Sequence, residues 1–189
     1  MFKLNSIKLL SILSLLALVT SGCATKITET PSPVTPTKVK LGSYSKVILV
    51  QSEIAPTYAK NAENIKAANK IDSELKQSMN TIFPSLEVKS PAEAKKMIAT
   101  PDTKVLVIKP YIKQIKFIGV GARIMVGAMA GSSVVIMDVT YIDGSNGEKL
   151  SNPGFMRQAG AYSDAFGVAS NSMLSEIARD VLLYTASNK

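Results

Sequence analysis

Residues 133–150 read SVVIMDVTYIDGSNGEKL and carry the clearest structural pattern in the chain. The first ten residues are rich in apolar and β-branched residues, with an apolar residue at every second position from 135, which predicts a β-strand at 133–142. One side of that strand is wholly apolar and is expected to face the core: Val135, Met137, Val139 and Tyr141. Residues 143–148 contain two glycines and predict a hairpin turn. Residues 149–150, and then 155–162, are expected to return along the strand.

Residues 104–117, KVLVIKPYIKQIKF, predict a second long strand. It begins with an apolar run at 105–108 and then alternates, which is typical of a strand that leaves the core and becomes half exposed. Regular alternation places Tyr111, Lys113, Ile115 and Phe117 on one side, and Ile112, Gln114 and Lys116 on the other. We expect this strand and the one at 133–142 to belong to one sheet.

Two amphipathic helices are expected to cover that sheet. Between Tyr58 and Phe83, apolar residues recur at spacings of three and four, and Pro84 ends the pattern. A second apolar stripe runs through residues 170–185. Shorter elements complete the order, with strands at 46–50 and 86–88 and a helix at 91–98. The sum predicts an α/β domain of the α+β type, with a mixed, largely antiparallel sheet packed against two main helices.

The N-terminal residues 1–22 are expected to be a signal helix and not part of the fold. Their apolar stretch, 9–19, is thin for a membrane span, which needs about 20 residues. Residues 18–23, LVTSGC, resemble the lipobox of bacterial lipoproteins, with Thr20 where leucine is more usual. The resemblance implies cleavage between Gly22 and Cys23, a diacylglycerol on the Cys23 thiol, and acylation of its new amino group, for example by palmitate. The alternative is an ordinary secreted protein with a chance cysteine at the cleavage point.

Cys23 is the single cysteine of the sequence, so it cannot form an intrachain disulfide. Ala24 follows it instead of aspartate. By resemblance to the sorting rule of Gram-negative lipoproteins, this favours the periplasmic face of the outer membrane over the inner membrane or the cell surface. Proline recurs through residues 30–37, which predicts an extended linker that holds the domain tens of ångströms from the membrane. The expected organisation is a signal peptide at 1–22, a lipidated linker at 23–43 and one domain at 44–189.

Residues 117–137, FIGVGARIMVGAMAGSSVVIM, admit three interpretations. They could form a membrane-inserted hairpin or helix, because the segment is long, apolar and carries a small-xxx-small step. They could form a glycine-rich crossover on the domain surface, which we favour because Arg123 is costly at bilayer depth. They could bind a phosphate, although no Walker lysine accompanies the glycines. The candidate partner or assembly residues are Gly121, Arg123, Gly127 and Gly131.

A family resemblance rests on several blocks of this region: GAR at 121–123, GA at 127–128, AGSS at 130–133, VTYID at 139–143 and GE at 147–148. Weaker matches are NPGF at 152–155 and NSML at 171–174. Together they resemble a family of uncharacterised bacterial lipoproteins with a domain of unknown function. The resemblance implies a periplasm-facing α/β domain with no assigned activity. A remoter similarity, at fold level, is to α/β domains of envelope-assembly lipoproteins such as the curli secretion channel.

Composition excludes several classes of function. The formal charge is +8, and it falls to +6 when residues 1–22, with two lysines and no acids, are removed. The lysines are scattered and no basic and aromatic cluster appears, which argues against nucleic acid as a partner. Histidine is absent and the single cysteine is committed, so the usual zinc sites and histidine-based triads are excluded. We expect no metal, no cofactor and no small-molecule ligand.

The candidate acids for catalysis are Asp138, Asp143, Glu148 and Asp164. Asp138 lies in mid-strand between apolar residues and is either a buried acid or an outward-facing residue, and we favour the second. Asp143 and Glu148 fit turn chemistry. The expected function is therefore a membrane-anchored envelope lipoprotein, not an enzyme, that binds an envelope protein or assembles with itself. The alternative is a small periplasmic enzyme that uses carboxylates alone.

Overall fold

The computed structural model describes residues 27–29, 35–98, 104–118, 131–160 and 168–189, together with positions 121 and 125. Cys23, Arg123, Gly127 and Asp164 lie outside the described residues, so the predictions made for them stay predictions. The strands are β1 (Ile27–Glu29), β2 (Lys46–Val50), β3 (Glu53–Ile54), β4 (Leu86–Lys89), β5 (Val105–Lys116), β6 (Ser133–Asp143), β7 (Lys149–Ser151) and β8 (Gly154–Ala159). The helices are η1 (Leu41–Ser43), α2 (Ala62–Asn80), α3 (Pro91–Met97) and α5 (Val168–Ser187).

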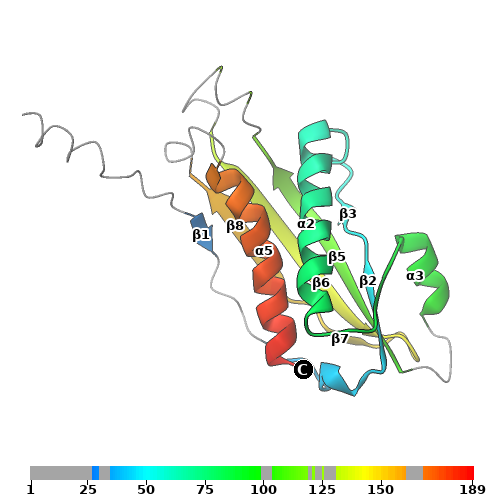
Figure 1. Cartoon of the computed structure of the whole chain (residues 1–189). Coiled ribbons are helices and arrows are strands. Elements are labelled where there is room, and N and C mark those ends of the chain that lie inside the picture. The colour runs from blue at the N-terminus through cyan, green and yellow to red at the C-terminus, as the bar shows by residue number, and fades with distance from the viewer. Residues whose placement is uncertain are drawn as a thin grey trace, which may run out of the picture.

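One mixed sheet organises the molecule (Figure 1). Its eight strands lie in the order β1-β8-β6-β5-β2-β4, with β3 beside β5 and β7 beside β6. Strands β4, β2 and β5 are parallel to one another, whereas the pairs β5–β6, β6–β8 and β8–β1 are antiparallel. The predicted α/β fold class, with a mixed sheet packed against two main helices, is therefore confirmed.

Helices lie on both faces of the parallel part of the sheet. Because right-handed crossovers from β2 to β4 and from β4 to β5 run in opposite directions across the sheet, they place α2 and α3 on opposite faces. Helix α5 packs beside α2 on the first face (Figure 1). The main core fills the space under α2 and α5, and a smaller apolar cluster lies under α3.

Helix α2 is shorter than the predicted span of 58–83. Asn61 caps its first turn by accepting a hydrogen bond from the Asn64 amide at 3.1 Å. It ends at Asn80, where the Thr81 hydroxyl bonds to the Ser78 carbonyl, four residues before the proline that was expected to stop it. Tyr58 and Phe83 still pack against the core from the flanking turns, which explains why the apolar period continues beyond the helix.

The side assignment for β6 is confirmed and that for β5 is wrong. Val135, Met137, Val139 and Tyr141 are all fully buried. In β5, however, Ile112 and Ile115 are both fully buried although they are three residues apart. A register irregularity between Ile112 and Gln114 supplies the reason, because one extra residue, Lys113, is accommodated without a partner in β6. The bulge reverses the alternation that the sequence predicts for the second half of the strand.

Part of the predicted linker lies on the domain. Leu41 is fully buried in the main core, and its amide donates to the Asn188 carbonyl at 2.9 Å. The Thr37 amide donates to the Asn188 side chain at 2.8 Å, and the Tyr184 hydroxyl donates to the Thr35 carbonyl at 2.7 Å. Strand β1 pairs with β8 still nearer the N-terminus. The proline-rich residues 30–37 therefore connect two segments that both contact the domain, and the predicted stand-off of tens of ångströms does not follow from this structure.

Candidate functional site

The back face of the sheet, opposite α2 and α5, is covered by α3 over only part of its area. Beyond α3, none of the described elements covers the back faces of β6 and β8. Register pairs Val134 with Gln158, Ile136 with Met156, and Asp138 with Gly154 across this area, and all of these residues are half-buried. We call this patch, with Tyr111 of β5, the open face. Val134, Ile136 and Met156 are apolar, and their side chains remain partly accessible to water.

Two ion pairs border the open face. The Lys113 ammonium, carried by the bulge residue, lies 2.9 Å from an Asp138 carboxylate oxygen, and Lys109 lies 2.6 Å from Glu53. The four side chains are 23–48% exposed, so water screens both pairs and each contributes about 0–1 kcal/mol to stability. The pairs therefore leave the open face with balanced charge.

Asp138 is placed as predicted, on the outward side of β6. Its carboxylate lies over Gly154 of the neighbouring strand, where an added β-carbon would come within 3.2 Å of it. Tyr111 is its cross-strand partner in β5 and is 37% exposed. With Lys113 bound to it and solvent beside it, Asp138 has the surroundings of a surface ion pair, which favours the structural interpretation over the catalytic one.

A cavity of about 470 Å³ lies next to the open face, between α3 and the sheet. Val50 and Val107 form its floor, and Ala94 and Ile98 come from the α3 side. Its charged lining residues are Glu53, Lys95 and Lys109, and the first and last of these already form an ion pair. The cavity thus extends the open face as a hollow with mixed apolar and charged walls.

The four residues predicted to form a partner segment separate into two groups. Arg123 and Gly127 lie outside the described residues. Gly131 has φ +83° and an added β-carbon would lie 3.3 Å from the Lys116 ammonium, so its role is conformational. Gly121 is exposed, and a β-carbon added there would meet no atom within 4 Å. The structure thus brings only Gly131 of this group against another described side chain.

The two ends of the segment 118–133 are joined by buried serines. The Ile118 amide donates to the Ser133 hydroxyl at 3.1 Å, and the Ser170 hydroxyl donates to the same oxygen at 2.7 Å. Both serines are fully buried. This network ties the end of β5, the start of β6 and the first turn of α5 together, and it gives Ser133 a structural role.

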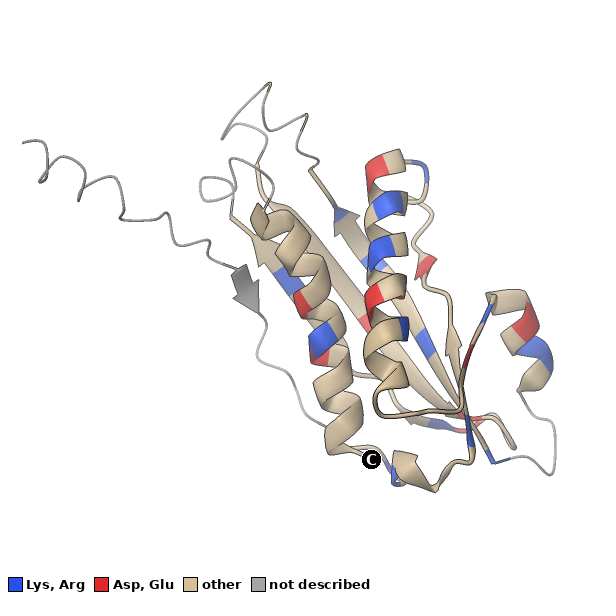
Figure 2. Ribbon diagram, in the orientation of Figure 1, with Lys and Arg blue, Asp and Glu red and all other residues tan. Residues whose placement is uncertain are grey.

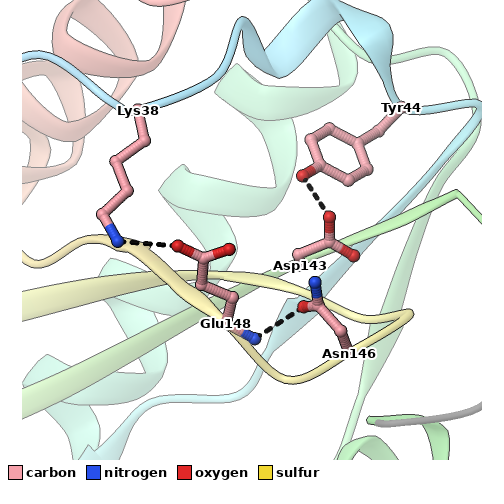
Figure 3. Close-up of polar contacts among 5 residues, drawn as sticks. All are labelled: Lys38, Tyr44, Asp143, Asn146 and Glu148. Carbon is pink, nitrogen blue, oxygen red and sulfur yellow. Dashed lines mark hydrogen bonds and ion pairs between the residues drawn. The ribbon is translucent and has the colours of Figure 1, made fainter.

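The β6–β7 turn carries a polar network in place of a catalytic group (Figure 3). The Tyr44 hydroxyl donates to Asp143 at 2.9 Å, and the Lys38 ammonium contacts Glu148 at 2.6 Å. The Glu148 amide donates to the Asn146 side chain at 2.8 Å. Burial opposes ionisation of Asp143, but hydrogen bonds from Ser145 and Tyr44 outweigh it and lower its pKa. The predicted turn chemistry of Asp143 and Glu148 is confirmed, and it fastens residues 38–44 to the sheet.

Sequence reasoning missed one partly buried carboxylate, Asp72 of α2. It accepts hydrogen bonds from the Ser52 amide at 3.1 Å and from the Ser52 hydroxyl at 2.5 Å. Burial raises the pKa of Asp72, although both bonds from Ser52 act in the opposite direction. The one available signal was its position beside Ile71 at the margin of the apolar stripe. The hydrogen bonds between Ser52 and Asp72 hold the segment that follows β2 against α2.

Charges of both signs are interspersed along α2 and α5, and neither sign is gathered on one of these helices (Figure 2). Within the described ranges, no group of three or more acidic, cysteine or histidine side chains is placed to bind a metal ion. No described helix has both the length and the apolar character needed to cross a membrane.

Comparison with known proteins gives fold likeness alone. No protein-family model matches the chain, and no curated protein matches it significantly. The PelC dodecamer from Paraburkholderia phytofirmans is 17% identical, with a TM-score of 0.46 over 81% of this chain and 94% of that chain. Protein XCC0632 from Xanthomonas campestris, of family DUF330, is 9% identical, with a TM-score of 0.49 over 84% and 91%. Lipoprotein GNA1162 from Neisseria meningitidis is 12% identical, with a TM-score of 0.36 over 76% and 99%.

Proposed function

We propose that the protein is a lipid-anchored component of the cell envelope that works by binding and not by catalysis, and that the occupant of its open face is a second copy of the chain. The anchor is Cys23, in the lipobox-like sequence LVTSGC, and Ala24 after it favours the periplasmic face of the outer membrane. The observation that carries the proposal is the open face, where half-buried apolar side chains lie on the part of the back face, over β6 and β8, that no described helix covers.

Charge supports a second copy as the occupant. A two-fold contact places the same patch on both partners, so a stable patch must complement itself. The open face meets this condition, because its lysines, Lys109 and Lys113, are matched by Glu53 and Asp138. In such a contact, Lys113 of each copy is able to exchange its Asp138 for that of the other copy. A patch of one sign would repel itself.

Anchoring supports the same occupant. Lipid attachment confines every copy to one membrane, which raises the local concentration that each copy experiences. An apolar patch too small to hold two chains together in dilute solution is able to do so under that condition. The open face is half-exposed and only partly apolar. We therefore expect it to hold two copies together when both are anchored in the same membrane.

Photo-crosslinking in intact cells tests the proposal. A photoreactive amino acid is introduced at Ile136 or Met156 in the open face, and at Lys76 on the exposed side of α2 as the matched control. We expect adducts with the mass of two chains from the first two positions and free monomer from the control. Monomer from all three positions would overturn the proposal, and an adduct with a different protein would replace the second copy by that partner.

Anchoring is tested separately by mass spectrometry of the mature N-terminus. We expect a peptide that begins at Cys23 and carries acyl chains, and we expect Cys23→Ser to release the protein from membranes. An unmodified mature chain without Cys23 at its N-terminus would contradict the lipoprotein assignment and leave the crosslinking result to stand by itself.

A further inference from the structure

The register of β1 determines how close the proposed lipid anchor lies to the domain. Ile27, the first residue of β1, pairs with Ala159 at the end of β8, and Ala159 also pairs with Ser133 at the start of β6. Cys23 precedes Ile27 by four residues. Since an extended chain advances at most about 3.6 Å per residue, the Cys23 backbone lies within about 14 Å of Ile27 whatever its path.

The same end of the sheet receives three other elements. We call it the anchor end and define it by Ile27, Lys116, Ser133 and Ala159. Register places Lys116 opposite Val134 there. The Phe117 amide donates to the Asn64 side chain at 3.0 Å, which brings the first turn of α2 to the anchor end. The Ser170–Ser133 hydrogen bond brings the first turn of α5 to it.

Two exposed apolar side chains lie in the first turns of the helices that reach the anchor end. Ile65 follows Asn64 in α2 and is 40% exposed, and Val168 begins α5 and is 60% exposed. At the opposite end, Leu183 and Val39 are the comparable exposed residues, and they lie beside the C-terminus and residues 37–41.

Basic side chains accompany Ile65 at the anchor end. Lys60, Lys66 and Lys116 are exposed around the anchor end, and Glu63 is the acid beside them in α2. Apolar residues that enter the headgroup region, with lysines around them, are the combination by which proteins lie on an anionic bilayer. The surface is thus matched in chemistry to the membrane from which the anchor emerges.

From these observations we infer that the anchor end docks on the lipid bilayer through Ile65 and Val168, so that the sheet stands on the membrane with the open face turned sideways. The inference rests on the proposed acylation of Cys23. We choose a lipid surface as the occupant because an acylated Cys23 would keep Ile27, and with it the anchor end, within about 14 Å of the anchored residue. Open faces held sideways in one membrane also meet one another, as the proposed self-association requires.

The unique cysteine makes this orientation measurable, since an acylated Cys23 leaves no other thiol in the chain. Single cysteines are introduced at Ile65 and Val168, and at Leu183 and Val39 as matched exposed controls, and each is labelled with an environment-sensitive fluorophore. The full mature lipoprotein is reconstituted into vesicles of phosphatidylethanolamine and phosphatidylglycerol that carry a quencher near the headgroup. We expect several-fold stronger quenching at positions 65 and 168 than at 183 and 39. Equal quenching, or stronger quenching at the controls, would overturn the orientation.

Flotation separates this inference from the proposed anchor. Quenching is read only on protein that floats with vesicles and whose acyl chains are confirmed by mass spectrometry. Acylated, floating protein without the quenching difference refutes the orientation alone, and protein without acyl chains refutes both. A flexible insertion between Ala24 and Ile27 is expected to reduce the difference, whereas the same insertion between Thr30 and Thr35, beyond β1, is expected to leave it unchanged. An equal effect of the two insertions would contradict the role of the short connection.

Discussion

Arg157 of β8 illustrates how a charged residue is accommodated under a helix. Its guanidinium donates from Nε and Nη2 to the two carboxylate oxygens of Asp180 in α5, at 2.6 and 2.5 Å. The two side chains are 9% and 18% exposed. Two parallel bonds match the planar geometry of both groups, so the pair sets the position of α5 on the sheet.

We predict that Asp180→Ala lowers the free energy of unfolding by about 2 kcal/mol, because it removes two charge-assisted hydrogen bonds from a largely buried guanidinium. Urea denaturation measures this change. The matched control is Arg179→Ala on the same helix, whose ion pair with Glu176 spans 3.8 Å between exposed side chains. It should change stability by less than about 0.5 kcal/mol. Comparable losses of stability in the two variants would show that the Arg157–Asp180 pair contributes no more to the free energy of unfolding than an exposed ion pair.

Asp72 and Asp143 should give opposite pH dependences. The folded-state pKa of Asp72 is raised above 3.8 by burial, so its favourable contribution is complete below that pH and is lost as the pH rises through the folded value. The pKa of Asp143 is lowered, so its contribution is present above 3.8 and is lost as the pH falls through the folded value.

The test is urea denaturation of Asp72→Asn and Asp143→Asn across the acidic range. Relative to the unmodified protein, Asp72→Asn should become more stable as the pH rises to neutrality, since asparagine accepts the Ser52 bonds without a buried charge. Asp143→Asn should become relatively less stable over the same interval. Parallel pH profiles of stability for the two variants would contradict the opposite pKa shifts of Asp72 and Asp143.

Gly131 shows how a single backbone angle sets the entry of the chain into strand β6. At φ +83°, the chain enters β6 from the left-handed region, which costs side-chain-bearing residues about 1–2 kcal/mol. The residue lies two positions before Ser133, whose hydroxyl joins β5 and α5. The angle at 131 therefore helps to set where the buried serines meet.

Gly131→Ala is expected to lower stability by about 1–2 kcal/mol, from backbone strain, while the Lys116 side chain moves aside. Thermal unfolding followed by circular dichroism measures it. Gly121→Ala is the control, since position 121 is helical, exposed and open, and alanine there should be neutral or slightly stabilising. A neutral result at 131 would mean that the backbone relaxes to a negative φ.

The β5 bulge shows what periodicity misses within an element. Polarity alone predicts that Ile112 and Ile115 lie on opposite sides, yet both are in the core. A long strand that pairs with two neighbours must keep its apolar side chains inward along its whole length, and one extra residue at Lys113 is sufficient to restore this. The same bulge aims Lys113 at Asp138.

At the scale of the molecule, the back face is uneven because a single short helix covers it. The crossover from β4 to β5 supplies α3, and the antiparallel strands β6 and β8 need no crossover to join them. No helix is therefore required over their back faces, and the back-face side chains are half-buried in the described part of the chain. The open face is a consequence of the topology.

We predict that Ile136→Glu abolishes association of the anchored protein while it changes the free energy of unfolding by less than about 1 kcal/mol, because the side chain is half-buried in the monomer. Crosslinking in membranes and urea denaturation give the two readouts. Lys76→Glu, on the exposed side of α2, is the control and should change neither. Undiminished crosslinking by Ile136→Glu would move the contact away from the open face.

Local sequence patterns were enough to establish the fold class and most elements, because period-two and period-3.6 apolar patterns record which faces are buried. Strand β2 was predicted to the residue, and β6 to within one. The prediction for Cys23 is also local, since a lipobox is a short contiguous signal. The pairing of β1 with β8, the bulge at Lys113, the packing of Leu41 and the Asp72–Ser52 contact emerged only from the folded chain. Three of these features join residues that are distant in the chain, and the bulge adds one residue without a strand partner. Neither kind of feature produces a local periodic pattern in the sequence.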